Sequence, residues 1–401
     1  MKRITLFAIL LCFTHHAYSN RLIAYYANWG DYYCTEERFR LVTDVNWAFL
    51  IPERTGDLKA WEEWEWERFR FFVETCPPEV RKFISVGGSG KVSASAFSIA
   101  CRKPNTREKL IENLTAFVVK HRLDGIDIDW EYPEESDTEN LNLFISGLKS
   151  SLERASRPSG KIYEISMAVY AGEYGTKGIS GYTLKAVDFI NIMAYDNDQE
   201  VNHSSLDLSL KAVFYWHQVR DMPYSKMVLG VPFYGRPAHS LSRDKPYREF
   251  AKAHQAFHND YIKDKGKWYY NGFGTLQEKV NMALSYGLMG IMCWELSQDR
   301  DDKYSLLRVL SQHVNDFECK QPESDVIEYD LCQEGFVVLK SEIPDQSGYI
   351  HQWTRNGEII KSGKETSLKV VRPGVYMLQT RKFNCTGKIQ FKVENKDECP
   401  N

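Results

Sequence analysis

Three carboxylates alternate along one short stretch of the sequence. Asp127, Asp129 and Glu131 are each separated by a single residue. In a β-strand their side chains would share one face, because successive side chains point to opposite faces. The opposite face would then be wholly apolar, formed by Ile126, Ile128 and Trp130. Like charges this close cannot all stay ionised, so at least one pKa should rise, and a carboxyl group kept protonated can act as a general acid. The pattern therefore favours acid catalysis over the alternative of a solvated strand face.

The surrounding chain alternates short apolar runs with amphipathic helical stretches from residue 21 to about residue 315. The predicted strands are residues 22–27, 45–51, 82–86, 125–130, 163–169, 189–194, 227–233 and 289–294. Helical periodicity is clearest over residues 110–118, 141–152 and 276–284. Eight β–α repeats in about 300 residues predict an α/β protein with a (β/α)8 barrel. The alternative fold, a doubly wound open sheet, lacks its usual glycine-rich turn after a strand. In a barrel, the carboxylates would point into the interior at the end where barrel enzymes place their active sites.

The composition excludes several other classes of protein. The chain has 401 residues, of which 43% are hydrophobic and 26% charged, as is typical of globular proteins. Its 51 basic and 54 acidic residues give a formal charge of −3. We expect no nucleic-acid partner, because a domain-wide basic excess is missing. We also expect no membrane span, because no apolar run reaches the roughly 18–20 residues that a membrane helix needs.

The first 19 residues have the composition of a secretory signal peptide. Two basic residues precede an apolar run at residues 4–13, and Ala17 and Ser19 are small residues at the positions that a signal peptidase prefers. We therefore expect cleavage after Ser19 and a secreted protein that is extracellular, periplasmic or displayed at the cell surface. Disulfides persist in such compartments. Eight cysteines follow residue 19, and their spacing alone does not choose a pairing.

The helical rhythm ends near residues 319–323. Beyond residue 325 the sequence shows only short alternating runs, at residues 336–340, 348–353, 367–371, 375–381 and 388–393. Turn dipeptides such as Asn-Gly and Pro-Gly separate them. The predicted organisation is therefore a signal peptide at residues 1–19, a barrel at 20–318 and a small all-β sandwich domain at 325–401.

Five segments resemble the chitinase-type enzymes of glycoside hydrolase family 18. The motif D-x-x-D-x-D-x-E at residues 124–131, followed by Tyr-Pro, resembles the catalytic strand of that family. Four further segments are similar to its third, sixth, seventh and eighth strands: Ser-Val-Gly-Gly at 85–88, Met-Ala-Tyr-Asp at 193–196, Gly-Val-Pro-Phe-Tyr-Gly-Arg at 230–236 and residues 290–295, which include Trp294. Their order along one chain makes the resemblance specific.

This resemblance implies a retaining hydrolase that cleaves β-1,4 bonds beside N-acetylglucosamine with the help of the substrate itself. Glu131 would protonate the glycosidic oxygen while the acetamido carbonyl of the substrate attacks the anomeric carbon and forms an oxazolinium ion. Asp129 would orient the acetamido group and share a proton with Asp127, and Tyr195 would bind the acetamido carbonyl. Further substrate-binding residues implied by the family are Tyr25 and Ser85 behind Asp127, Trp294 beneath the sugar, and Phe49, Met193, Asp196, Tyr234 and Arg236 along the cleft.

The same resemblance implies that the binding partner is chitin or an N-acetylglucosamine oligosaccharide. We expect no cofactor and no metal, and we expect the protein to be a monomer.

The loop at residues 197–205 is short and lacks tryptophan, and only about 50 residues lie between Arg236 and the eighth strand. Both features predict a shallow, open groove suited to endo-cleavage. Two alternatives stay open: an endo-β-N-acetylglucosaminidase acting on N-glycan cores, and a chitin-binding lectin, which the intact acid Glu131 disfavours. Three tryptophans in a predicted acidic helix could stack on sugars or pack in the core: Trp61, Trp64 and Trp66.

The C-terminal segment resembles a small immunoglobulin-like module. Its Cys332, Trp353 and Cys385 have a similar order to the Cys, Trp and Cys of such domains. The resemblance implies a bridge between Cys332 and Cys385, although Tyr376 lies nine residues before the second cysteine instead of two. We expect this module to be a spacer rather than an adhesion or carbohydrate-binding domain.

Overall fold

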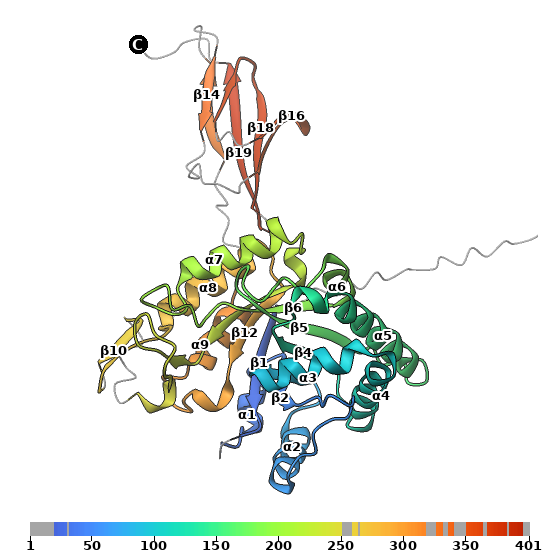
Figure 1. Ribbon diagram of the computed structural model, residues 1–401. Coiled ribbons are helices and arrows are strands. Elements are labelled where there is room, and N and C mark those ends of the chain that lie inside the picture. Colours follow the sequence, from blue (N-terminus) through green and yellow to red (C-terminus); the bar gives the residue numbers. More distant parts are fainter. Residues whose placement is uncertain are drawn as a thin grey trace, which may run out of the picture.

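The chain forms a closed (β/α)8 barrel followed by separate antiparallel-rich sheets (Figure 1). The computed structural model describes residues 20–29, 32–250, 259–263, 265–317, 326–331, 336–340, 350–363, 367–382 and 385–395. The predicted fold class is thereby confirmed. The expected signal peptide, residues 1–19, lies outside the described residues.

Eight parallel strands close the barrel in the order β1-β12-β7-β6-β5-β4-β3-β2. These strands are β1 (Arg21–Ala27), β2 (Asp44–Leu50), β3 (Arg81–Ser89), β4 (Gly125–Glu131), β5 (Glu164–Tyr170), β6 (Phe189–Met193), β7 (Met227–Pro232) and β12 (Gly290–Trp294). All eight predicted strands are confirmed, with ends that differ by no more than three residues. They read as nearly continuous apolar runs because parallel strands are buried on both faces.

Helices surround the ring of strands (Figure 1). They are α1 (Glu36–Phe39), α2 (Glu63–Thr75), α3 (Lys91–Arg102), α4 (Pro104–Lys120), α5 (Thr138–Ser156), α6 (Gly181–Ala186), α7 (Leu206–Phe214), α8 (Phe273–Tyr286) and α9 (Leu306–Asn315). Helix α8 ends at Gly287, whose φ of 79° is the left-handed conformation that glycine adopts most easily at a helix end. Between β7 and β12 the chain adds two small antiparallel pairs: β8 (Tyr234–Gly235) with β9 (Lys245–Pro246), and β10 (Tyr261–Lys263) with β11 (Lys267–Tyr269).

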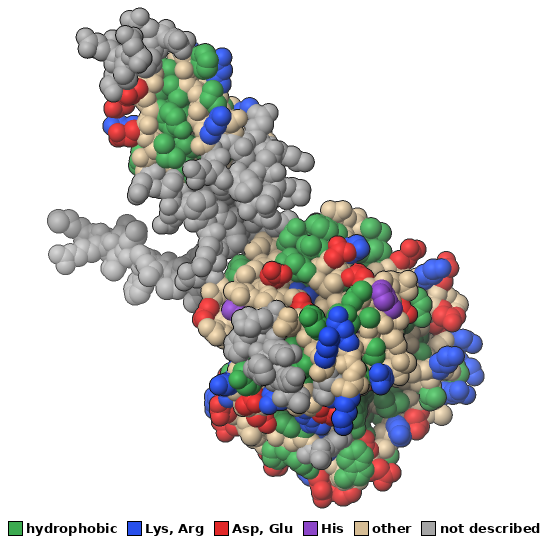
Figure 2. All heavy atoms as spheres, turned by 90° about the vertical axis from the view of Figure 1, so that its left-hand side faces the viewer, with side chains coloured by type: hydrophobic (Ala, Val, Ile, Leu, Met, Phe, Trp, Pro, Cys, Tyr) green, Lys and Arg blue, Asp and Glu red, His purple; other side chains and the backbone are tan. Residues whose placement is uncertain are grey.

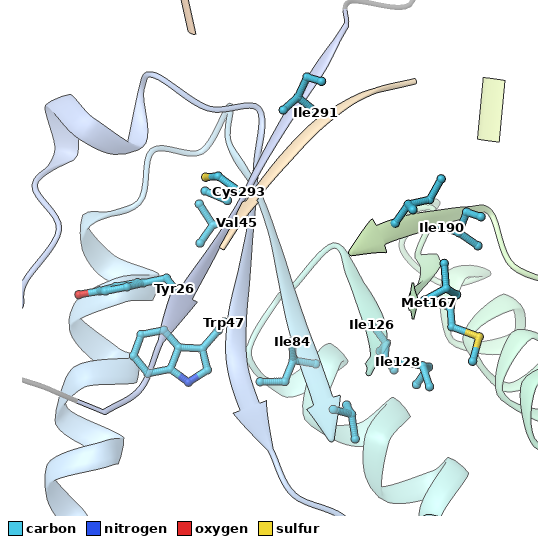
Figure 3. Close-up of a cluster of buried hydrophobic side chains, with 14 of the residues drawn as sticks. Tyr26, Val45, Trp47, Ile84, Ile126, Ile128, Met167, Ile190, Ile291 and Cys293 are labelled. Atoms are coloured by element: carbon cyan, nitrogen blue, oxygen red, sulfur yellow. The ribbon is translucent and has the colours of Figure 1, made fainter. Parts of the chain in front are cut away.

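An apolar layer between the strands and the helices fixes which way β4 faces. Figure 3 shows Ile126 and Ile128 of β4 in this layer beside Ile84 of β3, and all three are fully buried. The next apolar residue of β4, Trp130, stacks on Phe97 of α3 with the ring centroids 5.0 Å apart. Because side chains alternate along a strand, the three carboxylates of β4 point into the barrel.

The C-terminal strands form a five-stranded sheet in the order β13-β19-β18-β15-β16 and a two-stranded sheet of β14 and β17. Their bounds are β13 (Ile327–Leu331), β14 (Val337–Lys340), β15 (Ile350–Arg355), β16 (Glu358–Gly363), β17 (Ser367–Val370), β18 (Gly374–Lys382) and β19 (Cys385–Asn395). Trp353 is buried and stacks on Phe391 at 5.5 Å. The hydroxyl of Tyr376 donates to the carbonyl of Arg372 at 2.7 Å, like the corner tyrosine of immunoglobulin-type sandwiches. The expected all-β character of this segment is confirmed.

Four cysteines of the barrel, Cys34, Cys76, Cys101 and Cys293, are buried free thiols, so the described cysteines form no disulfide with one another. The expected bridge between Cys332 and Cys385 lies outside the described side chains. Within the described ranges, no helix is both long and apolar enough to cross a membrane. Acidic and basic side chains are interspersed on the face of the barrel that Figure 2 shows.

Candidate active site

Asp127 lies at the bottom of the site, fully shielded from solvent inside the barrel. Its Oδ2 accepts hydrogen bonds from the hydroxyls of Tyr25 and Ser85, each at 2.7 Å. Its Oδ1 accepts from the Ser166 hydroxyl at 2.7 Å and from Asn191 Nδ2 at 3.1 Å. Burial raises the pKa of Asp127, and these four hydrogen bonds oppose the shift. A carboxylate can accept about four hydrogen bonds, so this environment suits the ionised form.

Asp129 is also buried, but its surroundings are much poorer in donors. Its Oδ1 has no hydrogen-bond partner among the described residues, although it lies in the wall of an open cleft. Burial raises the pKa of Asp129 well above its usual value, and the negative charges of Glu131 and Asp127 act in the same direction. Asp129 therefore has free capacity to bind a ligand in the cleft.

Glu131 ends β4 at the mouth of the barrel, where it is half-buried. Burial raises its pKa, the negative charge of Asp196 adds to the effect, and a hydrogen bond with the Tyr132 side chain opposes it. A carboxyl group with a raised pKa that still faces a cleft has the two properties that a general acid needs, a proton to donate and access to the substrate.

The cleft above these carboxylates has a volume of about 700 Å³. It brings together residues from the ends of several strands, as barrel enzymes do. The predicted residues that line it are Phe49, Asp129, Glu131, Met193, Tyr195, Asp196, Tyr234, Arg236 and Trp294. Tyr25, Ser85 and Asp127 lie beneath this lining as one hydrogen-bonded group. All of the predicted residues thus belong to one site.

Aromatic rings form one wall of the cleft. Trp294 stacks on Phe49 with the centroids 5.6 Å apart and the planes 21° apart, and it lies 5.3 Å from the ring of Tyr25. Trp29 extends this wall, 6.0 Å from Phe49 and 6.2 Å from Trp294, and 48% of its surface is exposed. Trp29 was not among the predicted residues. Only Asn28 separates it from the end of the first predicted strand, and barrel sites lie at that end of the strands.

Asp196 is held as a carboxylate at the rim of the cleft. It accepts from the Tyr234 hydroxyl at 2.7 Å and from Arg236 through Nε at 2.5 Å and Nη2 at 2.8 Å. The backbone N–H of Asp196 donates to Nδ1 of the buried His203 at 3.3 Å, and the same nitrogen lies 3.3 Å from Oδ1 of the carboxylate. Although burial alone would raise the pKa of Asp196, hydrogen bonds from Arg236 and Tyr234 and the charge of Arg236 hold it below its usual range. The bidentate contact from the guanidinium group of Arg236 fixes the orientation of the Asp196 side chain.

A buried lysine supports the loop that carries Tyr195. The Nζ of Lys279 donates to the carbonyl and the hydroxyl of Ser204 and to Asn271 Oδ1, each at 2.8 Å. The Ser204 hydroxyl in turn donates to the carbonyl of Ala194 at 2.7 Å. Burial lowers the pKa of Lys279 to about 7. Sequence patterns gave no signal for this residue, because its partners come together only in the folded barrel.

The three tryptophans near α2 divide between core and surface. Trp61 is buried and donates from Nε1 to the carbonyl of Phe49 at 3.2 Å, and Trp66 packs against Phe69 and Phe117. Only Trp64 is exposed. In the part of the chain that the structure describes, no group of three His, Cys, Asp or Glu side chains could hold a metal ion.

Comparison with known proteins places this chain in a family. The family model described as glycosyl hydrolases family 18 matches residues 21–299. Endochitinase 1 of Metarhizium anisopliae is 26% identical over 357 residues, which cover 72% of this chain and 84% of that protein. A crystal structure of a family 18 chitinase from Flavobacterium johnsoniae is 28% identical, with a TM-score of 0.59 over 74% of this chain and 94% of its own.

The fold by itself is shared more widely. A chitinase-like agglutinin from Robinia pseudoacacia has a TM-score of 0.62 and 22% identity over 73% of this chain and 99% of its own, a likeness of fold alone. The family model, by contrast, covers more than half of the chain and includes every strand of the barrel. The chain therefore belongs to family 18 of the glycosyl hydrolases.

Proposed function

We propose that this protein is a chitinase that hydrolyses β-1,4 bonds in N-acetylglucosamine polymers or oligomers by substrate-assisted catalysis. The observation that carries the proposal is the pairing of Asp129 with Glu131 on one strand at the cleft. Asp129 has a buried oxygen without a hydrogen-bond partner among the described residues, and Glu131 has a raised pKa and access to the cleft. Substrate assistance needs one group that holds the acetamido arm and one that protonates the leaving oxygen.

In the first step Glu131 gives its proton to the glycosidic oxygen as the bond from that oxygen to the anomeric carbon breaks. The acetamido carbonyl oxygen of the same sugar forms a new bond to the anomeric carbon, which yields the oxazolinium ion. The leaving group departs as an alcohol. Asp129 accepts from the acetamido N–H and so keeps the carbonyl aimed at the anomeric carbon.

Tyr195 is available to stabilise this first step. Tyr195 is buried, and its hydroxyl donates to the sulfur of Met292, 4.0 Å away, which is a weak acceptor. It can therefore donate to the acetamido carbonyl as charge develops there. Burial raises the pKa of Tyr195 well above its usual value, with the charge of Asp129 adding to the shift, so the hydroxyl keeps its proton.

In the second step Glu131, now ionised, takes a proton from water as the water oxygen attacks the anomeric carbon. The bond from the acetamido oxygen breaks, and the original configuration is restored. Trp294 and Phe49 provide the stacked aromatic surface on which the reacting sugar would lie.

The test compares the wild type with Glu131→Gln on chitin oligosaccharides and, in parallel, on a high-mannose glycoprotein. We expect the wild type to release N,N′-diacetylchitobiose with the β-anomer formed first, as followed by NMR. Glu131→Gln should lose about 10²- to 10⁴-fold in turnover, as is typical for a lost general acid. The exposed Glu139→Gln on α5 is the matched control and should behave like the wild type.

Other outcomes would redirect the proposal. Near-normal turnover by Glu131→Gln would refute the assigned acid. Release of glycans with chitin untouched would identify an endo-β-N-acetylglucosaminidase. Retention of chitin without any turnover would identify a lectin.

We also propose that the protein acts outside the cytoplasm as a monomer, with residues 1–19 removed, a catalytic barrel at 20–318 and a β-domain spacer at 325–401. The N-terminal composition supports export. Determination of the N-terminus of the exported protein tests this proposal, and a mature chain that still begins at Met1 would contradict it.

A further inference from the structure

A second cavity opens beside the catalytic cleft. It has a volume of about 1040 Å³ and lies between α3 and two loops, residues 133–137 after β4 and residues 173–177 after β5. It shares Lys91, Glu131 and Tyr132 with the catalytic cleft, so the two spaces adjoin at the general acid.

The position of this cavity relative to Glu131 indicates which part of a substrate could enter it. Asp129, Tyr195 and Trp294, which would hold the reacting sugar, all line the catalytic cleft, and none of them lines the second cavity. The general acid protonates the oxygen that links the reacting sugar to the leaving group. If the proposed function holds, the leaving group therefore continues past Glu131, toward the second cavity.

An exposed aromatic ring stands in the wall of this cavity. Tyr174 is 70% exposed, and its ring makes edge contacts with Tyr132 at 5.7 Å and Tyr170 at 5.3 Å. Gly175 has a φ of 69°, and a Cβ there would lie 2.5 Å from the Tyr132 ring. The backbone beside Tyr174 is thus packed directly against Tyr132, which keeps the exposed ring in place.

Charged side chains of both signs surround Tyr174. Lys91, Lys177, Glu135 and Glu173 line the cavity and form no ion pair with any residue in the described ranges. A rigid aromatic face flanked by free donors and acceptors is the usual composition of a site for a polar ring compound such as a sugar. The loop at residues 197–205, after β6, contains no Trp, Tyr or Phe that could serve the same purpose.

We infer that this second cavity is a leaving-group subsite of a glycan-cleaving enzyme and that Tyr174 is the platform on which an N-acetylglucosamine unit of the leaving group stacks. The inference deepens the proposed function and rests on it for the direction of the substrate. Tyr174 then determines how much an extended leaving group contributes to binding, without touching the reacting atoms.

The experiment compares a substrate that has a sugar leaving group with one that has none. Chitohexaose has one, whereas p-nitrophenyl chitobioside releases only nitrophenol. For Tyr174→Ala we expect the KM for chitohexaose to rise about tenfold with kcat unchanged, because binding common to the ground and transition states is lost. Hydrolysis of the nitrophenyl substrate should stay at the wild-type rate. Tyr174→Phe keeps the ring and should retain wild-type KM values.

Tyr182→Ala is the matched control, because Tyr182 is a similarly exposed tyrosine on α6 outside both cavities. Equal losses on both substrates would show that Tyr174 acts on the acid through Tyr132, and unchanged kinetics on both would show that no sugar stacks there. Either result overturns the inference.

A binding measurement separates this inference from the proposed function. If the wild type hydrolyses neither substrate, the proposed function fails. The affinity of Glu131→Gln for chitohexaose, with and without Tyr174→Ala, then tests the subsite by calorimetry. An unchanged Kd would refute the subsite, and a weaker one would support it.

Discussion

Lys279 offers a prediction whose size follows directly from the structure. Its amine is fully buried, and burial lowers its pKa from 10.5 to about 7. Between pH 7 and pH 10.5, this lysine is protonated in the unfolded chain but largely deprotonated in the folded chain. Stability rises with pH wherever the unfolded state binds more protons. The contribution of Lys279 is therefore least favourable below pH 7, and it improves as the pH rises toward 10.5.

The expected slope is about 1.4 kcal/mol in the free energy of unfolding for each pH unit inside this window. Between pH 7.5 and pH 9.5 the change is about 2.5 kcal/mol, because the folded-state amine is still partly protonated at the lower limit. Lys279→Met removes the titrating group. The free energy of unfolding of the wild type should therefore gain about 2.5 kcal/mol relative to that of the variant over this interval.

The assay is urea unfolding at pH 7.5, 8.5 and 9.5 for the wild type, Lys279→Met and Lys185→Met. Lys185 is an exposed lysine on α6, so its replacement should leave the pH slope unchanged. Other groups also titrate near this range, including the buried thiols of Cys34 and Cys76, whose pKa values burial raises to about 12. They are present in all three proteins and cancel in the differences. Parallel curves for the wild type and Lys279→Met would refute the reasoning, because they would mean that Lys279 titrates alike in both states.

Two further predictions concern the walls of the cleft. Arg236→Lys should lower kcat/KM more at pH 4 than at pH 7. One ammonium group cannot contact both oxygens of Asp196, so the depressed pKa of that carboxyl would rise toward its ordinary range. A pH–rate profile that keeps the wild-type shape would contradict this prediction. Gly88→Ala should lower the free energy of unfolding by about 1–3 kcal/mol, as measured by calorimetry. Its φ is 90°, and the new Cβ would lie 2.6 Å from the ring of Phe49, so an unchanged Tm would contradict the close packing.

Sequence patterns were sufficient to predict the barrel because its strands carry strong local signals. Most are largely apolar runs, as is expected of parallel strands that are buried on both faces, and β4 alternates carboxylates with apolar residues. The small C-terminal sheets were harder. Strand β16 (Glu358–Gly363) is at the edge of its sheet and largely exposed, and β13 (Ile327–Leu331) pairs in parallel with the distant β19. Strand β16 shows no regular alternation of apolar and polar residues, whereas β13 does alternate Ile327, Tyr329 and Leu331 with two acidic residues and was missed all the same.

Some members of the site could not be predicted because each comes from a different strand without a motif of its own. Ser166 on β5 and Asn191 on β6 donate to Asp127 across the barrel, although both stand within otherwise apolar runs. A polar side chain within a buried strand is a signal only when its partner is known, because buried polar groups need hydrogen bonds. The partner is 39 residues away from Ser166 and 64 from Asn191.

The direction of β4 explains how one short motif yields three different carboxyl groups. The strand runs from the closed interior toward the mouth, so burial decreases from Asp127 through Asp129 to Glu131. Asp127 meets four donors, Asp129 keeps an oxygen that no described residue contacts with a hydrogen bond, and Glu131 reaches the cleft. A shift of one residue in register would turn all three into the apolar layer beneath the helices. The alternation of β4 thus fixes the inward face of the carboxylates, and their position along the strand gives each one a different environment and so a different chemistry.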